Sequence, residues 1–511
     1  MDQQTIARHF VDHAMHEAAT TIAERPAASA KEAQSIAVKK LLGLKPPQID
    51  WPDYLVMLLH VAASIEHALM IQYLYAAYTL RIEGKYEPQI KAWQTSLLMM
   101  AKEEMGHLLA VQNLLCLLRR PPYLKREDYP WDTNFYPFPF KLEPLTLGSV
   151  ACYAFAEMPP DWLDEDEPEM QKVKARLRAV LKGHLGGKRD DEVLHHVGTL
   201  YGLIIEIFKD PSYIPDWALD TDSYLSQAGW DDWGRGYAPR PESREEKELD
   251  AKRGPKALED ANMIIDRMAT RDVAIGVLKR IATQGEAPQS HKKKRVGVPL
   301  SHFERFLEMF QEYADICDQQ KNPRWTPAPD MPTNPMVPAR DGVQNGVHDQ
   351  IDDPYAAKWG ALFNLRYRIL LTYLAHSFDL GRRKDAGAPP LRGVVMNRVF
   401  GEMYNLKTIA GVLTRLPLEK TLSAKRAGPP FQMPWSLELP TGTSAPWRLH
   451  LRLIRDSRVL AKALADDPGA RPITTHQNYL DALIKLDEQA ERQIDRILAA
   501  GGPSESRSAA E

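Results

Sequence analysis

The stretch from Leu97 to Leu118 constrains the fold of this chain more than any other segment. Apolar residues recur along it at alternating steps of four and three, which predicts an amphipathic helix with one buried face. Glu104 and His107 lie in the middle of that face. A carboxylate and an imidazole inside an apolar face are costly unless a partner neutralises them. Because Glu-x-x-His places an oxygen and a nitrogen ligand one turn apart, the pattern predicts a metal site.

The preceding helix shows the same kind of interruption. From Trp51 an apolar stripe runs to Leu80, and Glu66 is the single carboxylate on it. Only a short polar turn near residues 84–88 separates the two helices, so we expect them to pack as an antiparallel hairpin. The ionisable side chains of both helices would then face one core.

Helical patterns dominate the rest of the chain. They cover residues 147–157, 190–208, 272–286, 359–380, 396–416, 447–466 and 474–498. Ser301 and Glu304 form a capping-box pattern, which predicts a further helix start. No segment alternates as a strand would, so the chain is predicted to be all-α. Residues 121–140 are rich in proline and aromatic side chains, so they cannot form a regular helix and are expected to be a long loop. Such a loop could be the wall of a pocket or an ordered cover.

Changes in composition suggest the following domain organisation. We expect a polar N-terminal extension over residues 1–48 and a helical bundle with the metal site over residues 49–320. Residues 321–350 are rich in Pro, Asn and Gly and predict a linker. A C-terminal helical region, residues 351–498, is expected to pack on the bundle, and residues 499–511 are expected to be a disordered tail.

Composition excludes several kinds of partner. The chain has 511 residues and a net charge of -3, so no electrostatic attraction to nucleic acid or to a membrane surface is expected. No apolar run is long enough to predict a membrane span. The three cysteines lie far apart and no secretion signal precedes the first helix, which together predict a cytoplasmic protein.

The residue types of the predicted site favour particular metals. Mixed carboxylate and imidazole ligands suit iron or manganese better than metals that prefer thiolates. Two metal ions would need about six such ligands, drawn from four helices. The chain shows no nucleophile elbow, phosphate-binding loop or dinucleotide fingerprint that would point to other chemistry.

Five segments of the chain resemble a known motif series. They read IEHALMIQYLYAAY, KEEMGHLLAVQNLL, VGTLYGLI, IATQGEA and SHFERF. The series is that of the bacterial ferritin-like family that includes the ferritin-like part of the violacein-pathway iminophenyl-pyruvate dimer synthase, and the resemblance covers roughly residues 50–435. It implies a ferritin-like four-helix bundle, with long irregular loops and additional C-terminal helices, around a carboxylate-bridged site for two iron ions; manganese is the alternative metal.

When the family's metal ligands are carried over to this chain by position, the resemblance implies that the ligands are Glu66, Glu104, His107, Glu286 and His302. The chain departs from the family pattern at Thr199 and Thr283, where the family has Glu. Glu206, seven residues after Thr199 and on the same helical face, is the expected substitute for the third-helix ligand. A site with a single metal is the alternative.

Each implied ligand has a structural alternative that requires no metal. Glu104 and His107 could form a buried hydrogen-bonded pair, and Glu286 and His302 could be a helix cap and a surface imidazole. A second Glu-x-x-His, Glu192 with His195, fits a solvated helix face.

Three further residues lie beside the predicted ligands. Glu103 is expected to be a surface carboxylate or to support a ligand. Tyr73 and Tyr201 are expected either to donate hydrogen bonds near the metals or to serve as core tyrosines.

These observations predict a metal-dependent oxidoreductase. The leading hypothesis is a non-haem di-iron oxidase or oxygenase that takes dioxygen and a small organic, amino-acid-derived metabolite, with oxidative coupling implied by the resemblance. The alternative is a non-catalytic helical scaffold or metal-binding protein whose site has partly decayed. The sequence leaves a homo-oligomer open.

Overall fold

The chain divides into two compact units. The N-terminal unit comprises Met1–Arg126 and Pro130–Ala328, and the C-terminal unit comprises Glu127–Tyr129 and Pro329–Glu511. The computed structural model describes residues 29–45, 48–133, 135–159, 162, 166–184, 197–230, 232–233, 263–285, 300–338, 349–381, 391–420, 424–467 and 474–500.

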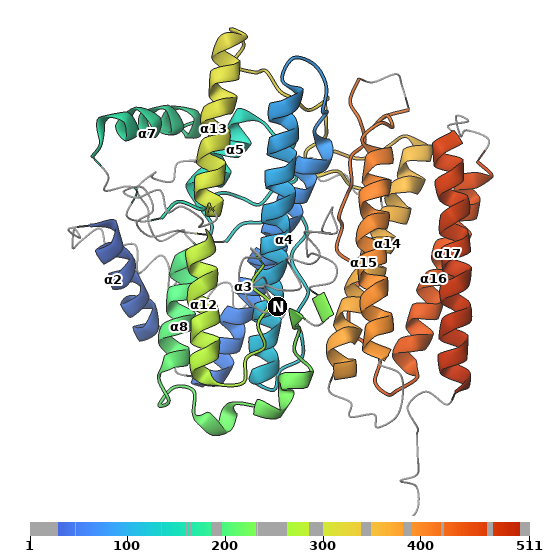
Figure 1. Cartoon of the computed structure of the whole chain (residues 1–511), viewed down its shortest axis with the longest axis horizontal. Coiled ribbons are helices and arrows are strands. Elements are labelled where there is room, and N and C mark those ends of the chain that lie inside the picture. The colour runs from blue at the N-terminus through green and yellow to red at the C-terminus, as the bar shows by residue number, and fades with distance from the viewer. Residues whose placement is uncertain are drawn as a thin grey trace, which may run out of the picture. The chain divides into compact units, whose positions relative to one another are not determined.

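The N-terminal unit is built on the two longest helices of the described chain, α3 (Trp51–Thr79) and α4 (Glu87–Leu117). The Asp50 side chain caps α3 by accepting a hydrogen bond from the backbone N–H of Asp53 at 2.8 Å. Gly84, at φ +83°, allows the left-handed turn between the helices. The two helices pack along their length (Figure 1), which confirms the predicted hairpin.

Shorter helices complete this unit (Figure 1). They are α2 (Ala30–Gly43), α5 (Leu147–Ala156), α7 (Pro168–Leu181), α8 (Val197–Lys209), α12 (Arg271–Gly285) and α13 (His302–Gln319), with 3₁₀ turns at Asp216–Ala218 and Thr221–Leu225. Helix α13 packs on α5, α12 packs on α8, and α8 packs on α3.

Local sequence fixes two of these helix ends. Ser301 and Glu304 form the predicted capping box at the start of α13. At the end of α5, the backbone N–H of Glu157 still bonds to Tyr153 O, and Pro159 follows two residues later. Since the residue before a proline is disfavoured in the α conformation, the helix cannot continue.

The aromatic-rich segment of residues 121–140 is an ordered cover where the structure describes it. Phe135 and Phe140 are fully buried, and Tyr136 stacks on Phe140 with ring centroids 4.2 Å apart. Tyr136, Phe138 and Pro139 of the segment also line a small cavity, so the segment is an ordered cover that forms part of a pocket wall.

The described part of the C-terminal unit contains four long helices. They are α14 (Pro354–Gly381), α15 (Leu391–Leu413), α16 (Ala445–Ala465) and α17 (Thr474–Ala499). Helix α14 packs on α15 and α16, and α16 packs on α17. The fully buried Trp359 and Trp447 anchor its core. That this region packs on the bundle stays a prediction.

The described residues contain no β-strand, only three isolated β-bridges, so the predicted all-α class is confirmed. Helix α3 is long and apolar enough to cross a membrane by length and composition, and 67% of its most apolar window is buried inside the fold. Such burial is expected of a core helix.

Candidate metal centre

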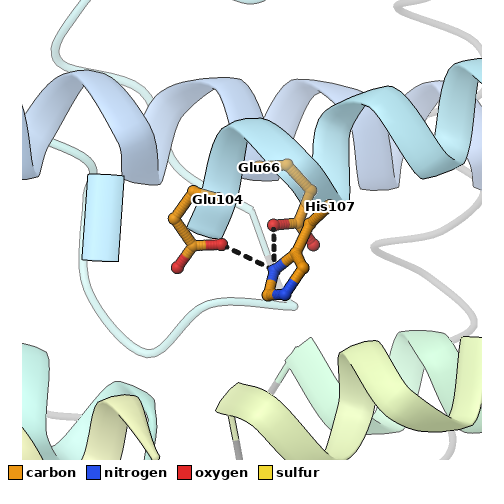
Figure 2. Close-up of side chains that lie close together, drawn as sticks. All are labelled: Glu66, Glu104 and His107. Carbon is orange, nitrogen blue, oxygen red and sulfur yellow. Dashed lines mark hydrogen bonds and ion pairs between the residues drawn. The ribbon is translucent and has the colours of Figure 1, made fainter. Parts of the chain in front are cut away.

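Three buried side chains of the α3–α4 hairpin form a first triad, Glu66, Glu104 and His107. Their exposed fractions do not exceed 2%. His107 Nδ1 lies 2.9 Å from Glu104 Oε2 and 3.3 Å from Glu66 Oε2. Figure 2 shows both carboxylates directed at this one nitrogen. The arrangement presents two oxygen ligands and one nitrogen ligand to a common point.

A second triad shares Glu104 with the first and adds Glu157 and His302. His302 Nδ1 lies 3.0 Å from Glu104 Oε1 and 3.9 Å from Glu157 Oε1. In each triad one ligand atom from each residue lies within 4.8 Å of the other two. Glu104 therefore directs one carboxylate oxygen to each triad, which is the arrangement of a carboxylate that bridges two metal ions.

A tyrosine hydroxyl holds the terminal carboxylate of each triad. Tyr201 donates to Glu66 Oε1 at 2.5 Å, and Tyr73 donates to Glu157 Oε1 at 2.7 Å. Both tyrosines are buried. Each hydrogen bond fixes the position of a carboxylate through its Oε1 atom. In Glu66 the other oxygen, Oε2, faces His107, whereas in Glu157 the same Oε1 atom also lies 3.9 Å from His302 Nδ1.

The two histidines are oriented through their second ring nitrogen. His302 Nε2 lies 3.0 Å from Glu103 Oε2, and Glu103 accepts two hydrogen bonds from Arg305, at 2.7 and 3.1 Å. His107 Nε2 lies 2.9 Å from Gln284 Oε1. With Nε2–H donated to these oxygens, Nδ1 of each ring faces the carboxylates of its triad and can bind a metal ion once it has lost its proton, which is how proteins commonly fix the tautomer of a metal-binding histidine.

Residues of four shorter helices meet at the two triads. His302 is the first residue of α13, Glu157 follows the last residue of α5, Gly285 belongs to α12 and Gly198 to α8. All four residues line one cavity of about 20 Å³. A cavity of this size holds about one water molecule. The described walls therefore fit ions and their small ligands rather than a large organic molecule.

Burial and mutual charge set the protonation of the first triad in the absence of metal. Burial, followed by the charge of Glu104, raises the pKa of Glu66 to about 8. Burial lowers the pKa of His107, but the hydrogen bond and charge of Glu104 outweigh it and raise that pKa to about 10. His107, and Glu66 below pH 8, therefore carry protons that a metal ion must displace.

The remaining pKa shifts follow the same logic. Burial would raise the pKa of Glu104, but the charge of His302 and the hydrogen bond from His107 hold it below its usual range. Burial would lower the pKa of His302, but the charge of Glu104 and the hydrogen bond to Glu103 raise it well above its usual value.

The residues present fit a pair of metal ions. Glu66 Oε2 and His302 Nδ1 are both buried and have no hydrogen-bond partner of acceptable geometry. One lies in each triad, on the side that faces Glu104. Buried polar atoms are rarely left unsatisfied, so each marks a position where a ligand is expected. The donor set of three carboxylates and two imidazoles suits iron or manganese.

The structure brings together four of the ligands predicted from sequence, Glu66, Glu104, His107 and His302. It does not bring Glu206 to the cluster. Glu206 lies near the end of α8, its side chain is 40% exposed, and it forms an ion pair with Lys209 at 2.5 Å. Seven residues from Thr199 are nearly two helical turns, so Glu206 lies too far along the helix axis to reach the triads.

The other residues singled out in the sequence are either not described or lie outside the two triads. Glu286, Glu192 and His195 lie outside the described residues. Thr199 is fully buried in α8, whereas Thr283 is exposed and donates to Lys279 O at 2.8 Å.

Sequence reasoning missed Glu157 and Gln284. Glu157 is 5% exposed and completes the second triad from the end of a ten-residue helix that is otherwise almost entirely apolar. A carboxylate at a helix C-terminus opposes the helix dipole, so this position was a detectable signal. Gln284 appeared only as the first residue of the Gln-Gly-Glu motif, in which Glu286 was the expected ligand.

Comparison with known proteins agrees with this site. Residues 59–311 match the model of the ferritin-like family, and this range contains every residue of both triads. The chain is also 24% identical over 409 residues to the dichlorochromopyrrolate synthase of Lentzea aerocolonigenes. That alignment covers 74% of this chain and 36% of the relative, so the chain spans about a third of the relative's length. No solved structure matches the chain.

Proposed function

We propose that this chain, whose residues 59–311 form a ferritin-like domain, is a di-iron oxidase or oxygenase that acts on a small organic metabolite with dioxygen. One observation carries the proposal. Glu104 directs its two oxygens to two different Glu–His pairs inside one buried cluster. A purely structural ion pair needs only one such pair, whereas a bridged site for two metals needs both.

The triad residues would hold the metals between them. Glu66 and His107 would bind one ion, Glu157 and His302 the other, and Glu104 both. When bound, the ions would supply one-electron and dioxygen chemistry that no side chain offers. The chain contributes rigid positioning, since Tyr201 and Tyr73 fix the terminal carboxylates and Glu103 fixes the His302 ring.

Oxidative coupling of an amino-acid-derived imine is the more specific reaction we propose. The similarity to a protein named dichlorochromopyrrolate synthase supports it. The resemblance of the five sequence motifs to the family that includes the iminophenyl-pyruvate dimer synthase also supports it. Joining two imine molecules forms one carbon–carbon bond and releases two protons and two electrons. One dioxygen molecule accepts them and leaves as hydrogen peroxide.

Metal content and the optical response to dioxygen test the general proposal. After iron-replete expression we expect two metal ions per chain and a spectral change when the reduced protein meets dioxygen. Glu104→Gln should lose both properties, because this residue belongs to both triads. A wild-type protein without bound transition metal contradicts the proposal.

Indole-3-pyruvate imine, generated in place by an amino-acid oxidase, tests the specific reaction. We expect the coupled dimer with the iron-loaded wild type and unchanged imine with Glu104→Gln. Unchanged imine with an iron-loaded, dioxygen-responsive wild type would reject this substrate while leaving the oxidase proposal intact.

A non-catalytic scaffold is the second candidate, and one observation favours it. The ionisable groups of the cluster already pair with one another, through His107 with Glu104 and through His302 with Glu103. Melting curves with and without Fe(II) separate the two candidates, because a metal that binds the folded state raises its stability. We expect Fe(II) to stabilise the wild type and not Glu104→Ala; equal shifts would favour the scaffold.

A further inference from the structure

The cavity at the two triads reaches the surface on one side. Every residue that lines it from α3, α4 and α13 is buried, and so is Glu157. The half-buried residues of its lining all belong to α8 and α12, and they are Val197, Gly198, Ala282 and Gly285. Among the described residues, the wall is therefore closed towards α3, α4 and α13 and reaches solvent where α8 and α12 form it.

The four residues at this opening are small. Helices α8 and α12 pack against each other (Figure 1), and none of the four residues that they place at the opening is larger than valine. A Cβ atom added at Gly285 would lie 3.0 Å from Glu157 Oε2. The backbone of α12 therefore lies directly against this carboxylate, and the opening leads to the second triad.

The proposed metal ligands approach the cavity from its other sides. They come from α3, α4 and α13 and from the residue that follows α5. Of the described residues of α8 and α12 that line the cavity, Tyr201 alone carries an oxygen on its side chain, and its hydroxyl is already donated to Glu66. A catalytic metal ion needs a coordination position that the protein does not fill, and in this centre such positions face α8 and α12.

We propose that dioxygen reaches the metal centre through this opening, between Val197 of α8 and Ala282 of α12. The inference rests on the proposed function, because it assigns a path to the co-substrate of that reaction. The two residues limit the width of the passage from two different helices, and neither belongs to a triad. Their size therefore sets how fast a small ligand arrives, whereas metal binding does not depend on them.

A larger side chain at either position should obstruct the passage. The cavity of about 20 Å³ holds about one water molecule. Leucine in place of Ala282, or phenylalanine in place of Val197, adds more carbon atoms than that space can hold. A ligand can then pass only when the new side chain leaves its preferred rotamer, which costs free energy and slows entry.

Nitric oxide is a suitable probe, because it has the size of dioxygen, binds ferrous ions and changes their absorption spectrum without turnover. Anaerobic stopped-flow mixing with the iron-loaded full chain measures its association rate. We expect Ala282→Leu and Val197→Phe to bind nitric oxide roughly three- to tenfold more slowly than the wild type, the effect of moving one side chain out of its rotamer. Unchanged rates in either variant, with its iron retained, would overturn the proposed passage.

Two further variants show whether the position or only the added bulk matters. Thr283→Leu is the matched control, since Thr283 follows Ala282 in the same helix, is exposed and does not line the cavity. It should keep the wild-type rate, and an equal slowing there would count against the passage. Ala282→Gly widens the opening and should bind nitric oxide at least as fast as the wild type; slower binding would also overturn the proposal.

Metal analysis of the same samples separates a failure of the passage from a failure of the proposed function. A wild-type protein that holds no iron would overturn both. An iron-loaded wild type whose nitric oxide rate is shared by Ala282→Leu and Val197→Phe would overturn the passage and leave the oxidase proposal intact.

Discussion

Glu157→Gln should remove one of the two proposed metal ions and leave the other. Glu157 belongs only to the second triad, whereas Glu66 and His107 belong only to the first. The substitution removes the charge but keeps the shape of the side chain, and the amide oxygen can still accept the Tyr73 hydroxyl that now lies 2.7 Å away. We therefore expect a folded protein that binds one metal ion per chain.

The size of the effect follows from ligand loss. Changing a residue that only supports a metal ligand costs about 10- to 100-fold in affinity, so losing a charged ligand should cost at least about 100-fold. At a metal concentration of about 100 times the wild-type Kd, each bound ion stabilises the fold by about 2.7 kcal/mol. A 100-fold weaker site retains only about 0.4 kcal/mol, a loss of about 2.3 kcal/mol at the second triad.

Metal analysis and denaturant unfolding of the same samples measure both quantities. Glu143→Gln is the matched control, because Glu143 is a carboxylate of the same unit whose pKa burial also raises, and it belongs to neither triad. It should keep two metal ions and the full metal-dependent stabilisation. Two ions bound to Glu157→Gln with wild-type affinity would refute the assignment of Glu157 as a ligand.

Three further perturbations test other contacts of the centre. Tyr201→Phe removes the 2.5 Å hydrogen bond to Glu66 and should weaken metal binding about tenfold in a competition titration, with wild-type affinity as the contrary result. Metal affinity should rise about tenfold per pH unit for each proton displaced, because metal and proton compete for the same groups. The rise should continue up to about pH 8 for Glu66 and about pH 10 for His107. A metal affinity that stays constant from pH 6 to 9 would contradict this. Arg305→Met should destabilise the metal-free protein by up to about 3 kcal/mol in denaturant unfolding, because it leaves the buried Glu103 with His302 as its remaining cationic partner, and adding Glu103→Gln should restore part of the loss; unchanged stability would contradict this.

The all-α fold and half of the centre could be predicted from sequence for a physical reason. Glu66, Glu104 and His107 interrupt long, strongly periodic apolar stripes, and an ionisable residue on such a stripe is visible without a structure. Both helices are continuous through the site, so helical spacing alone places these side chains on the shared core. The capping box at Ser301 likewise located His302 at a helix start.

The other half depends on where separate helix ends meet, which sequence spacing does not encode. Glu157 reaches the centre from the end of α5, and its partner His302 lies at the start of α13. A search for the third ligand along α8 leads to Glu206, whose distance along the helix axis excludes it. The support of His302 by Glu103 and Arg305 also requires the tertiary packing of α13 against α4.

Anomalous scattering at the iron edge, from crystals of the iron-loaded protein, tests the central claim most directly. If Glu104 bridges two ions, two anomalous peaks lie beside it, one within bonding distance of Glu66 and His107 and the other of Glu157 and His302. A single peak, or two peaks that Glu104 does not join, would contradict the bridged centre.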